Sequence, residues 1–279
     1  MIQLGIRLHD TAELPFEERL ETVRAQGFSC VHLALSKVSG LPSAPEAFTP
    51  GYAMALRHLF AKHELDVAVL GCYQNPGNPD EQMMARIRNQ YLAHIRLASL
   101  LGCGVVGTET GALNEDYHYD PQDTVSEQAL EQLIRNLKPI VLYAEKMGVI
   151  LAIEPVWKHI VSDADRARTV LDEIGSPNLQ VILDPVNLIS PARYQQRNET
   201  IAHAIEVLGR DVAVIHLKDC RLEHGEVVSS ACGTGELDYS QIISFAERSK
   251  PCIQATLENT TPENAVMARR YIEEREGRV

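Results

Sequence analysis

Short apolar runs recur along the chain and alternate with segments whose apolar residues lie three or four positions apart. The short runs are rich in Val, Ile and Leu, which is typical of strands buried on both faces of a parallel sheet. They predict eight strands, near residues 2–8, 30–35, 66–71, 104–108, 149–154, 179–184, 211–217 and 252–258. The pattern indicates one repeated unit, a strand followed by a helix.

The segments between these runs carry helix start and stop signals. A capping box at Thr124-Val125-Ser126-Glu127 predicts a helix that reaches Met147, and Thr261-Pro262-Glu263 places proline at the first helical position of the last helix. Ser162-Asp163 opens another helix, which ends at Gly175. Further helices are predicted over Pro15–Gln26, Pro79–Leu101, 197–208 and 240–248.

Eight strand–helix units predict an α/β fold, a single (β/α)8 TIM barrel that occupies residues 1–279 as one domain. An open doubly wound sheet is the alternative, but the chain has no Gly-rich phosphate loop to support it. No linker rich in Gly, Ser or Pro divides the chain. The longest irregular stretches, residues 36–50 and 109–123, follow strands and therefore belong to the C-terminal rim, where barrel active sites form.

Four of the predicted strands end in an ionisable side chain. These residues are Glu154, Asp184, His216 and Glu258, one from each of the last four units. A buried charge is costly unless it is paired, and the C-terminal ends of barrel strands meet at one mouth. Three carboxylates and one imidazole that converge there suit a single divalent metal ion, Mn²⁺, Mg²⁺, Co²⁺ or Zn²⁺.

Bulk composition narrows the range of partners. The net charge of −12 argues against binding to nucleic acid or to an anionic membrane through general electrostatics. No apolar run approaches the roughly 20 residues that cross a bilayer, and no signal peptide is visible. The six cysteines form no CxxC pair, which favours reduced thiols and a cytoplasmic location.

Local sequence motifs give a family resemblance that covers nearly the whole chain. The motifs are Ile153-Glu154-Pro155, Leu183-Asp184-Pro185-Val186-Asn187, His216-Leu217-Lys218-Asp219, Gly233-Thr234-Gly235-Glu236-Leu237-Asp238 and Leu257-Glu258-Asn259. They resemble those of the xylose-isomerase-like TIM-barrel superfamily, which contains sugar isomerases, ketose 3-epimerases, inosose dehydratases and endonuclease IV repair enzymes. The resemblance implies that Glu154, Asp184, His216 and Glu258 bind the metal. It also implies that Glu154 and Glu258 form the catalytic acid–base pair.

Five further residues are candidates for binding the substrate. Lys218 shares the strand face of His216, because side chains alternate along a strand, and Glu109 ends the fourth strand. His159 and Arg221 lie in the loops after strands 5 and 7, and Asn187 follows Asp184 by three residues. Ketose 3-epimerases usually have a histidine at the position of Asn187, so this departure favours a related but different substrate.

Other residues are weaker candidates. They are His9, Gln74, Asn75 and Trp157, whose ring could pack on a sugar or on the protein, and two cysteines near strand ends, Cys72 and Cys220. His118 is expected to be exposed.

We therefore expect a divalent-metal-dependent isomerase or epimerase of a small sugar or sugar derivative that transfers a proton through a metal-stabilised enediolate. The main alternative is a metal-dependent dehydratase of a keto-inositol or related polyol, which would share the enolate step. A DNA-repair endonuclease is disfavoured by the acidic chain and by the single extra histidine, His224, between Cys220 and Gly235. A non-catalytic sugar-binding barrel is disfavoured by the intact set of ligands. The expected partner is a small carbohydrate, and the resemblance leaves a homo-oligomer open.

Overall fold

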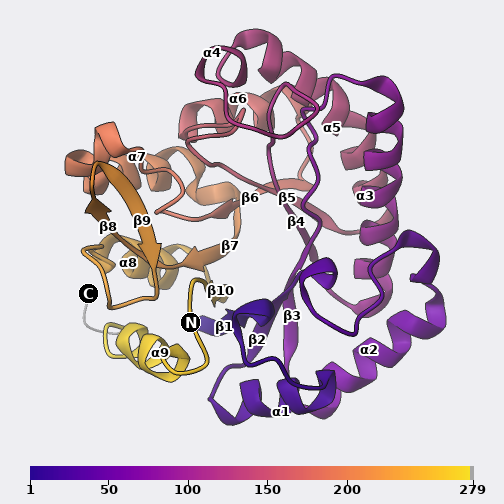
Figure 1. Ribbon diagram of the computed structural model, residues 1–279, viewed down its shortest axis with the longest axis vertical. Helices are drawn as coiled ribbons and strands as arrows, with labels where there is room; N and C mark the ends of the chain where they lie inside the picture. Colours follow the sequence, from indigo (N-terminus) through magenta and orange to yellow (C-terminus); the bar gives the residue numbers. More distant parts are fainter. Residues whose placement is uncertain (277–279) are drawn as a thin grey trace.

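The computed structural model describes residues 1–276 and contains a closed barrel of eight parallel strands (Figure 1). Around the barrel the strands follow the order β1-β10-β7-β6-β5-β4-β3-β2. Their bounds are β1 Ile2–Arg7, β2 Cys30–Leu33, β3 Asp66–Gly71, β4 Val105–Glu109, β5 Ile150–Glu154, β6 Leu179–Leu183, β7 Val212–Leu217 and β10 Ile253–Leu257. The predicted TIM barrel and all eight predicted strands are confirmed.

Helices surround the barrel on the outside, as Figure 1 shows. They are α1 Phe16–Ala25, α2 Pro50–Lys62, α3 Glu81–Leu101, α4 Pro121–Thr124, α5 Glu127–Met147, α6 Ala164–Ile174, α7 Arg197–Leu208, α8 Ser240–Ser249 and α9 Ala265–Glu273. Short 3₁₀ turns lie at Leu8–Asp10, Leu35–Lys37, Pro45–Ala47, Pro191–Gln196 and Gly209–Asp211. Among residues 1–276, no helix has both the length and the apolar character needed to cross a membrane.

Two of the predicted helix starts are wrong. Thr124 does not cap α5, because it closes the short helix α4, and its hydroxyl accepts a hydrogen bond from the backbone N–H of Asp120. Ser126 is the actual cap, with its hydroxyl accepting from the N–H of Ala129. The last helix starts at Ala265 and not at Pro262.

The segment after β7 holds an element that the sequence pattern did not predict. Strands β8 Asp219–Glu223 and β9 Glu226–Ser230 pair antiparallel as a hairpin outside the barrel. His224 and Gly225 form its turn, and both have positive φ angles, 50° and 85°. The hairpin extends the C-terminal rim beside the barrel mouth (Figure 1).

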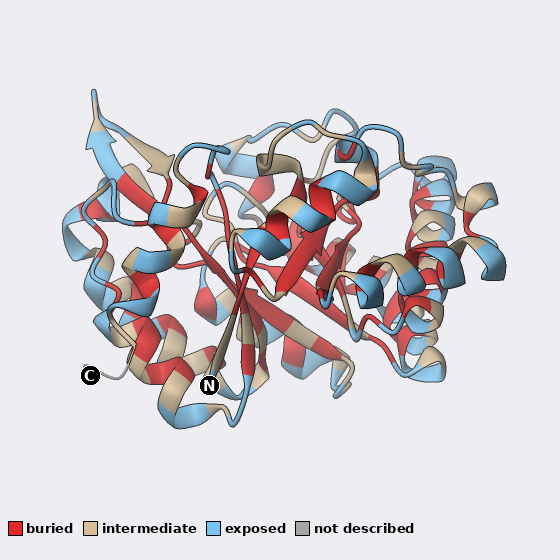
Figure 2. Cartoon of the chain, turned by 90° about the horizontal axis from the view of Figure 1, so that it is seen from below, coloured by how far each residue is buried: buried red, intermediate tan, exposed pale blue. Residues whose placement is uncertain are grey.

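The barrel interior is packed and forms no open channel. A cluster of buried apolar side chains fills it: Cys30, Ala68, Val69, Ala152, Ile182 and Val214. Gly107 of β4 leaves room for this cluster, because a Cβ atom there would lie 2.6 Å from Val69 and 2.7 Å from Ile182. A second, larger core packs the helices against the outer face of the strands, and Figure 2 shows the strands buried within the exposed outer surfaces of the helices. This packing fixes the strand ends rigidly, so the side chains at the mouth are held in place.

Candidate metal centre

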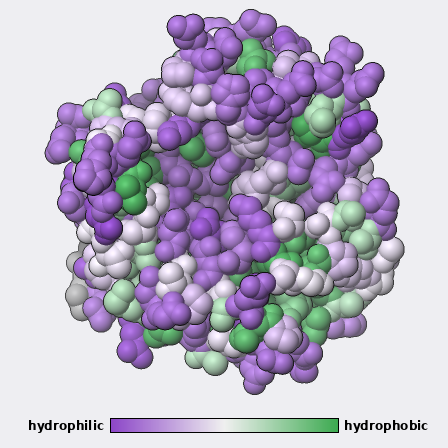
Figure 3. All heavy atoms as spheres, in the orientation of Figure 1, coloured by the Kyte–Doolittle hydropathy of each residue, from purple (hydrophilic) through white to green (hydrophobic). Residues whose placement is uncertain are grey.

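The four ionisable residues at the ends of the last four barrel strands meet at the mouth. Glu154 ends β5, Asp184 follows β6, His216 lies in β7 and Glu258 follows β10. All four are buried, with exposed fractions between 0% and 4%. In the view of Figure 3, hydrophilic residues gather over the centre of the barrel.

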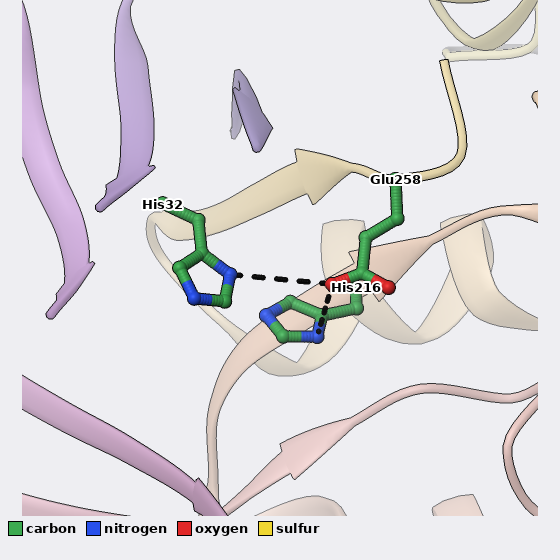
Figure 4. A group of neighbouring side chains, drawn as sticks. All are labelled: His32, His216 and Glu258. Carbon is green, nitrogen blue, oxygen red and sulfur yellow. Dashed lines mark ion pairs between the residues drawn. The ribbon is translucent and has the colours of Figure 1, made fainter. Parts of the chain in front are cut away.

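His216 lies between two of the carboxylates. Its Nδ1 atom is 3.1 Å from Oε1 of Glu258 and 3.4 Å from Oε2 of Glu154. One potential ligand atom from each of Glu154, Asp184 and His216 lies within 4.8 Å of the others, and the same holds for His32, His216 and Glu258. Figure 4 shows the second group, with His32 and His216 approaching the carboxylate of Glu258. The predicted convergence of the four residues is therefore present.

Two buried or partly buried cations neutralise part of this negative charge. The Lys218 ammonium lies 2.7 Å from Oδ2 of Asp184 and 3.2 Å from Oε2 of Glu258. Arg7 of β1 reaches the same oxygen of Glu258 at 3.2 Å and also pairs with Asp10 at 2.8 Å. Lys218, a candidate for substrate binding from the sequence, is therefore paired with two carboxylates in the structure.

The cluster shifts the pKa values of Asp184, Glu258, His216 and Lys218. Burial raises the pKa of Asp184 to about 6, although Lys218 opposes the shift. Burial also works against ionisation of Glu258, but His216, Lys218 and Arg7 outweigh it and hold the pKa of Glu258 well below its usual range. Burial lowers the pKa of His216, yet the carboxylates of Glu258 and Glu154 dominate and raise it to about 9. The same balance, dominated by Asp184 and Glu258, raises the pKa of Lys218. This field strongly favours positive charge.

The donor atoms fit a divalent cation. Nε2 of His216 is buried and has no hydrogen-bond partner, whereas Oδ2 of Asp184 contacts Lys218 and Nδ1 of His216 contacts the two glutamates. Buried polar atoms are normally satisfied, so an unpartnered nitrogen beside buried carboxylates is suited to binding a cation. Carboxylate oxygens with one imidazole nitrogen suit Mn²⁺, Mg²⁺, Co²⁺ or Zn²⁺ and do not discriminate among them.

Hydrogen bonds orient two of these carboxylates. Asn187 donates from Nδ2 to Oε1 of Glu154 at 2.6 Å. Oδ1 of Asp184 accepts the backbone N–H groups of Val186 and Asn187 at 2.9 and 3.1 Å, which leaves Oδ2 facing Lys218. Asn187 therefore contacts a candidate metal ligand, and this contact accounts for its place in the site.

A second group of polar side chains lies along the rim at β4 and β5. Glu109 pairs in register with Glu154 across these strands. It accepts a hydrogen bond from the hydroxyl of Tyr117 at 2.9 Å, and Nδ1 of His159 lies 3.9 Å away. Burial lowers the pKa of His159 to about 4, so this ring is neutral. Glu109 and His159 thus lie together beside the cluster, where the sequence predicted them.

Arg221 lies apart from the cluster. It belongs to the exposed hairpin strand β8, where it pairs with Glu223 and donates to the carbonyl of Thr234. Because Arg221 belongs to the unpredicted hairpin strand β8, its contacts are with the hairpin and with Thr234 and not with the four candidate ligands.

Asp219 explains the remaining motif residues. Its buried carboxylate accepts the N–H groups of Cys220, Gly233 and Leu237 at 2.8 to 3.1 Å. Gly235 approaches so closely that a Cβ atom there would lie 2.4 Å from Oδ1 of Asp219. These contacts fold the segment after the hairpin against β7, so the Gly-Thr-Gly motif is structural.

The weaker candidates divide into structural and rim residues. Oδ1 of Asn75 accepts the N–H groups of Gly77 and Ala112, so this side chain shapes a loop. Trp157 packs on Tyr119 and lines a groove of about 1050 Å³ between α6 and α7. His118 is exposed, as predicted. Burial raises the pKa values of the Cys72 and Cys220 thiols, the latter to about 12, so both thiols keep their protons at neutral pH.

Three residues at the mouth were missed from the sequence. They are Arg7, His32 and Tyr73, all from the first three strand units. His32 is fully buried and stacks on His216 with ring centres 5.0 Å apart, and the hydroxyl of Tyr73 lies 2.9 Å from its Nε2. The available signal was a histidine inside the apolar strand Cys30–Leu33, whose four residues are all buried.

Solved structures with the same fold include proteins that are named for different enzymatic activities. A 3-keto-D-glucoside 4-epimerase from E. coli superposes with a TM-score of 0.77 at 12% identity, covering 98% of this chain and 100% of the other. The probable 3-DHS dehydratase from Bacillus anthracis gives 0.74 at 13%, covering 98% of both chains. The IOLI protein with a binding zinc atom gives 0.72 at 17%, covering 98% and 95%. At these identities the likeness shows the fold alone.

Sequence comparison identifies the family. No curated protein sequence matches the chain. A family model described as "Xylose isomerase-like TIM barrel" matches residues 20–275, nearly the whole length. The chain therefore belongs to the xylose isomerase-like TIM-barrel family.

Proposed function

We propose that this protein is a divalent-metal-dependent isomerase or epimerase of a small sugar or sugar derivative. The observation that carries the proposal is the buried meeting of Glu154, Asp184, His216 and Glu258 at the C-terminal mouth, where their potential ligand atoms form two overlapping groups of three, the second completed by His32. Barrel active sites form at this mouth. The named epimerases, a probable dehydratase and a zinc-bound protein among the similar folds support the same class of chemistry.

In this proposal Glu154, Asp184, His216 and Glu258 hold one metal ion. A divalent ion held by these residues would supply the positive charge that polarises a carbonyl of the sugar and acidifies the adjacent C–H. Oxygen ligands from three carboxylates leave the identity of the metal open among Mn²⁺, Mg²⁺, Co²⁺ and Zn²⁺.

The two glutamates are the proposed acid–base pair. Asn187 orients Glu154, and His216, Lys218 and Arg7 keep Glu258 ionised, as a base requires. One removes the proton from carbon and the other returns it. Return to the opposite face of the same carbon gives epimerisation, and transfer to the neighbouring carbon gives isomerisation.

A dehydratase of a keto-inositol or related polyol is the second candidate. The ammonium of Lys218 favours it, because this group lies 2.7 Å from Asp184 and 3.2 Å from Glu258 inside the cluster. It could protonate a hydroxyl that leaves after the shared proton-abstraction step. Glu109, His159 and Asn187 are proposed substrate contacts in both reactions, whereas the contacts of Arg221 are with Glu223 and Thr234 at the exposed hairpin.

The decisive experiment combines metal analysis with solvent exchange. Purified protein should contain or bind one equivalent of a divalent ion, measured by elemental analysis and titration calorimetry. A panel of ketoses and keto-polyols in D₂O should then show exchange of a carbon-bound hydrogen by NMR. Loss of water detected by mass would select the dehydratase. The absence of a stoichiometric divalent ion from active protein would overturn the proposal.

A further inference from the structure

We propose that His32 is a substrate-contacting hydrogen-bond donor, held by Tyr73 with its proton on Nδ1. The inference rests on the proposed function for the oxygen that it serves, a carbonyl or hydroxyl oxygen of the sugar. It assigns a role to a residue of β2, on the opposite side of the mouth from the candidate ligands of β5 and β6 (Figure 1).

The first step is the position of the ring. His32 is fully buried and stacks on His216 with an interplanar angle of 24°. Its Nδ1 atom points to Glu258 and lies 4.0 Å from Oε1, beyond hydrogen-bond distance (Figure 4). That nitrogen has no hydrogen-bond partner. A polar atom that is buried, unpartnered and directed at a candidate catalytic carboxylate indicates a ligand atom between the two.

The second step is the support behind the ring. The Tyr73 hydroxyl lies 2.9 Å from Nε2 of His32. Gly71, two residues before Tyr73, makes this contact possible. A Cβ atom at residue 71 would lie 2.8 Å from Nε2 of His32 and 2.7 Å from the Tyr73 ring. The pair is therefore built into the wall of the mouth, and a rotation of the imidazole would break it.

The third step fixes the proton. Burial and the nearby carboxylates of Glu154 and Glu258 raise the pKa of Tyr73 well above its usual value, so the phenol keeps its hydrogen and can donate it to Nε2. On the other side of the ring the unpartnered Nδ1 faces the carboxylate of Glu258, which favours a hydrogen over a lone pair on this nitrogen. A neutral imidazole that accepts at Nε2 carries its hydrogen on Nδ1. This tautomer turns an N–H group and not a lone pair towards the carboxylate of Glu258.

The consequence separates His32 from the metal ligands. A metal ion needs the lone pair of Nδ1, whereas a substrate oxygen needs its hydrogen. With Nε2 occupied by Tyr73, the structure favours the second use. A neutral donor at this point stabilises negative charge that develops on the sugar oxygen without adding a proton to it.

NMR of the tautomer tests the inference without any substrate. A long-range ¹H–¹⁵N spectrum of uniformly labelled protein should show His32 protonated on Nδ1. His94 provides an internal reference, because its Nδ1 lies 2.8 Å from the carbonyl of Gln90, which can only accept. The variants His32→Gln and His94→Gln assign the two signals. In Tyr73→Phe the preference of His32 for Nδ1–H should weaken while His94 stays unchanged. A wild-type His32 with its hydrogen on Nε2 would overturn the inference.

Three substitutions at residue 32 test the contact itself. Asparagine retains a donor near the Nδ1 position, glutamine places one near the Nε2 position, and leucine has none. We expect kcat/KM to fall within about tenfold for His32→Asn and by about 10²-fold or more for His32→Gln and His32→Leu. The affinity for Mn²⁺, measured by calorimetry, should stay within about tenfold in all three.

Each alternative gives a different result. Equal losses in His32→Asn and His32→Leu would exclude a donor role, and loss of Mn²⁺ binding would make His32 a metal ligand. A wild-type protein that turns over no sugar would overturn the proposed function, although the NMR tautomer would still be measurable. The two failures are therefore distinguishable.

Discussion

Two stacked histidines at the barrel mouth respond in opposite ways to the same surroundings. His32 comes from the first half of the barrel and His216 from the second, with ring centres 5.0 Å apart. Burial dominates at His32 and lowers its pKa, whereas Glu258 and Glu154 overcome burial at His216 and raise its pKa to about 9. The ring of His32, whose pKa is lowered, therefore lies only a few ångströms from the highly charged cluster around His216.

The same division extends to the other strands. The last four barrel strands each end in one candidate metal ligand, and Lys218 lies among these ligands. The first four strands contribute Arg7, the His32–Tyr73 pair and Glu109. The comparison teaches that the second half of the mouth gathers three buried carboxylates around His216 and Lys218, whereas the first half places a hydrogen-bonded His–Tyr pair, Arg7 and Glu109 beside them.

The largest expected effect is the loss of a catalytic carboxylate from the charged half. Glu154→Gln and Glu258→Gln should each lower turnover by about 10³-fold or more, since each removes a metal ligand and one member of the acid–base pair. Circular dichroism should show that both variants remain folded. Retained turnover in steady-state assays of either variant would remove that glutamate from the acid–base role.

Removal of the buried ammonium should mainly affect stability. Lys218→Met leaves Asp184 and Glu258 without a cation that both now contact, and breaking a buried ion pair typically costs about 3–5 kcal/mol. Urea unfolding should show this loss, and added Mn²⁺ should restore part of it by supplying positive charge. Arg221→Met is the control. It removes a cation from the exposed hairpin and should change the free energy of unfolding by about 0.5 kcal/mol or less. Equal effects of the two substitutions would contradict the comparison.

The fold and the charged half of the mouth could both be predicted from the sequence, for the same reason. A buried parallel strand is a local pattern, and in a barrel its last residue necessarily points to the shared mouth. Glu154, Asp184, His216 and Glu258 therefore needed only their own strand and the topology to be placed. The family resemblance then suggested their roles.

The His32–Tyr73 pair of the first half could not be predicted in the same way. The contact joins residues that lie 41 positions apart and depends on the absence of a side chain at Gly71. The position of Arg221 could not be predicted from the sequence either. It depends on a hairpin whose strands have no core-facing apolar alternation and lie outside the barrel. Thr124 failed as a cap because a short helix ends there, and local sequence did not distinguish it from Ser126.

A smaller effect is expected where a neutral amide supports the charged half. Asn187→Ala removes the hydrogen bond to Oε1 of Glu154, so the carboxylate loses its fixed orientation. Comparable supporting contacts are worth about 10–100-fold in metal affinity or activity. We expect a loss near the lower limit, seen in kcat more than in KM. Asn187→Asp provides the contrast, because it places a second carboxylate against Glu154 and should be worse than alanine. A wild-type kcat in Asn187→Ala would show that Glu154 needs no support.

The smallest expected effect concerns a histidine in the first half that lies away from the mouth. His94 of α3 is buried against Phe48, and burial lowers its pKa. In the unfolded chain the His94 ring takes up a proton below a pH of about 6.5, but in the folded protein burial disfavours this protonation. The stabilising contribution of His94 is therefore present above that pH and is lost as the pH falls. Each unit of pKa difference corresponds to about 1.4 kcal/mol.

Urea unfolding between pH 7 and pH 5 tests this effect in His94→Gln. The free energy of unfolding should fall less steeply with decreasing pH in the variant than in the wild type, because glutamine binds no proton. Partly buried histidines such as His9 and His159, with pKa values of about 3 and 4, should preserve part of the slope. The contribution of His216 to this pH dependence has the opposite sign, because a pKa that is raised in the folded protein favours stability at low pH. An unchanged slope in His94→Gln would mean that the buried ring of His94 contributes little to acid sensitivity and that the carboxylates at the mouth govern it.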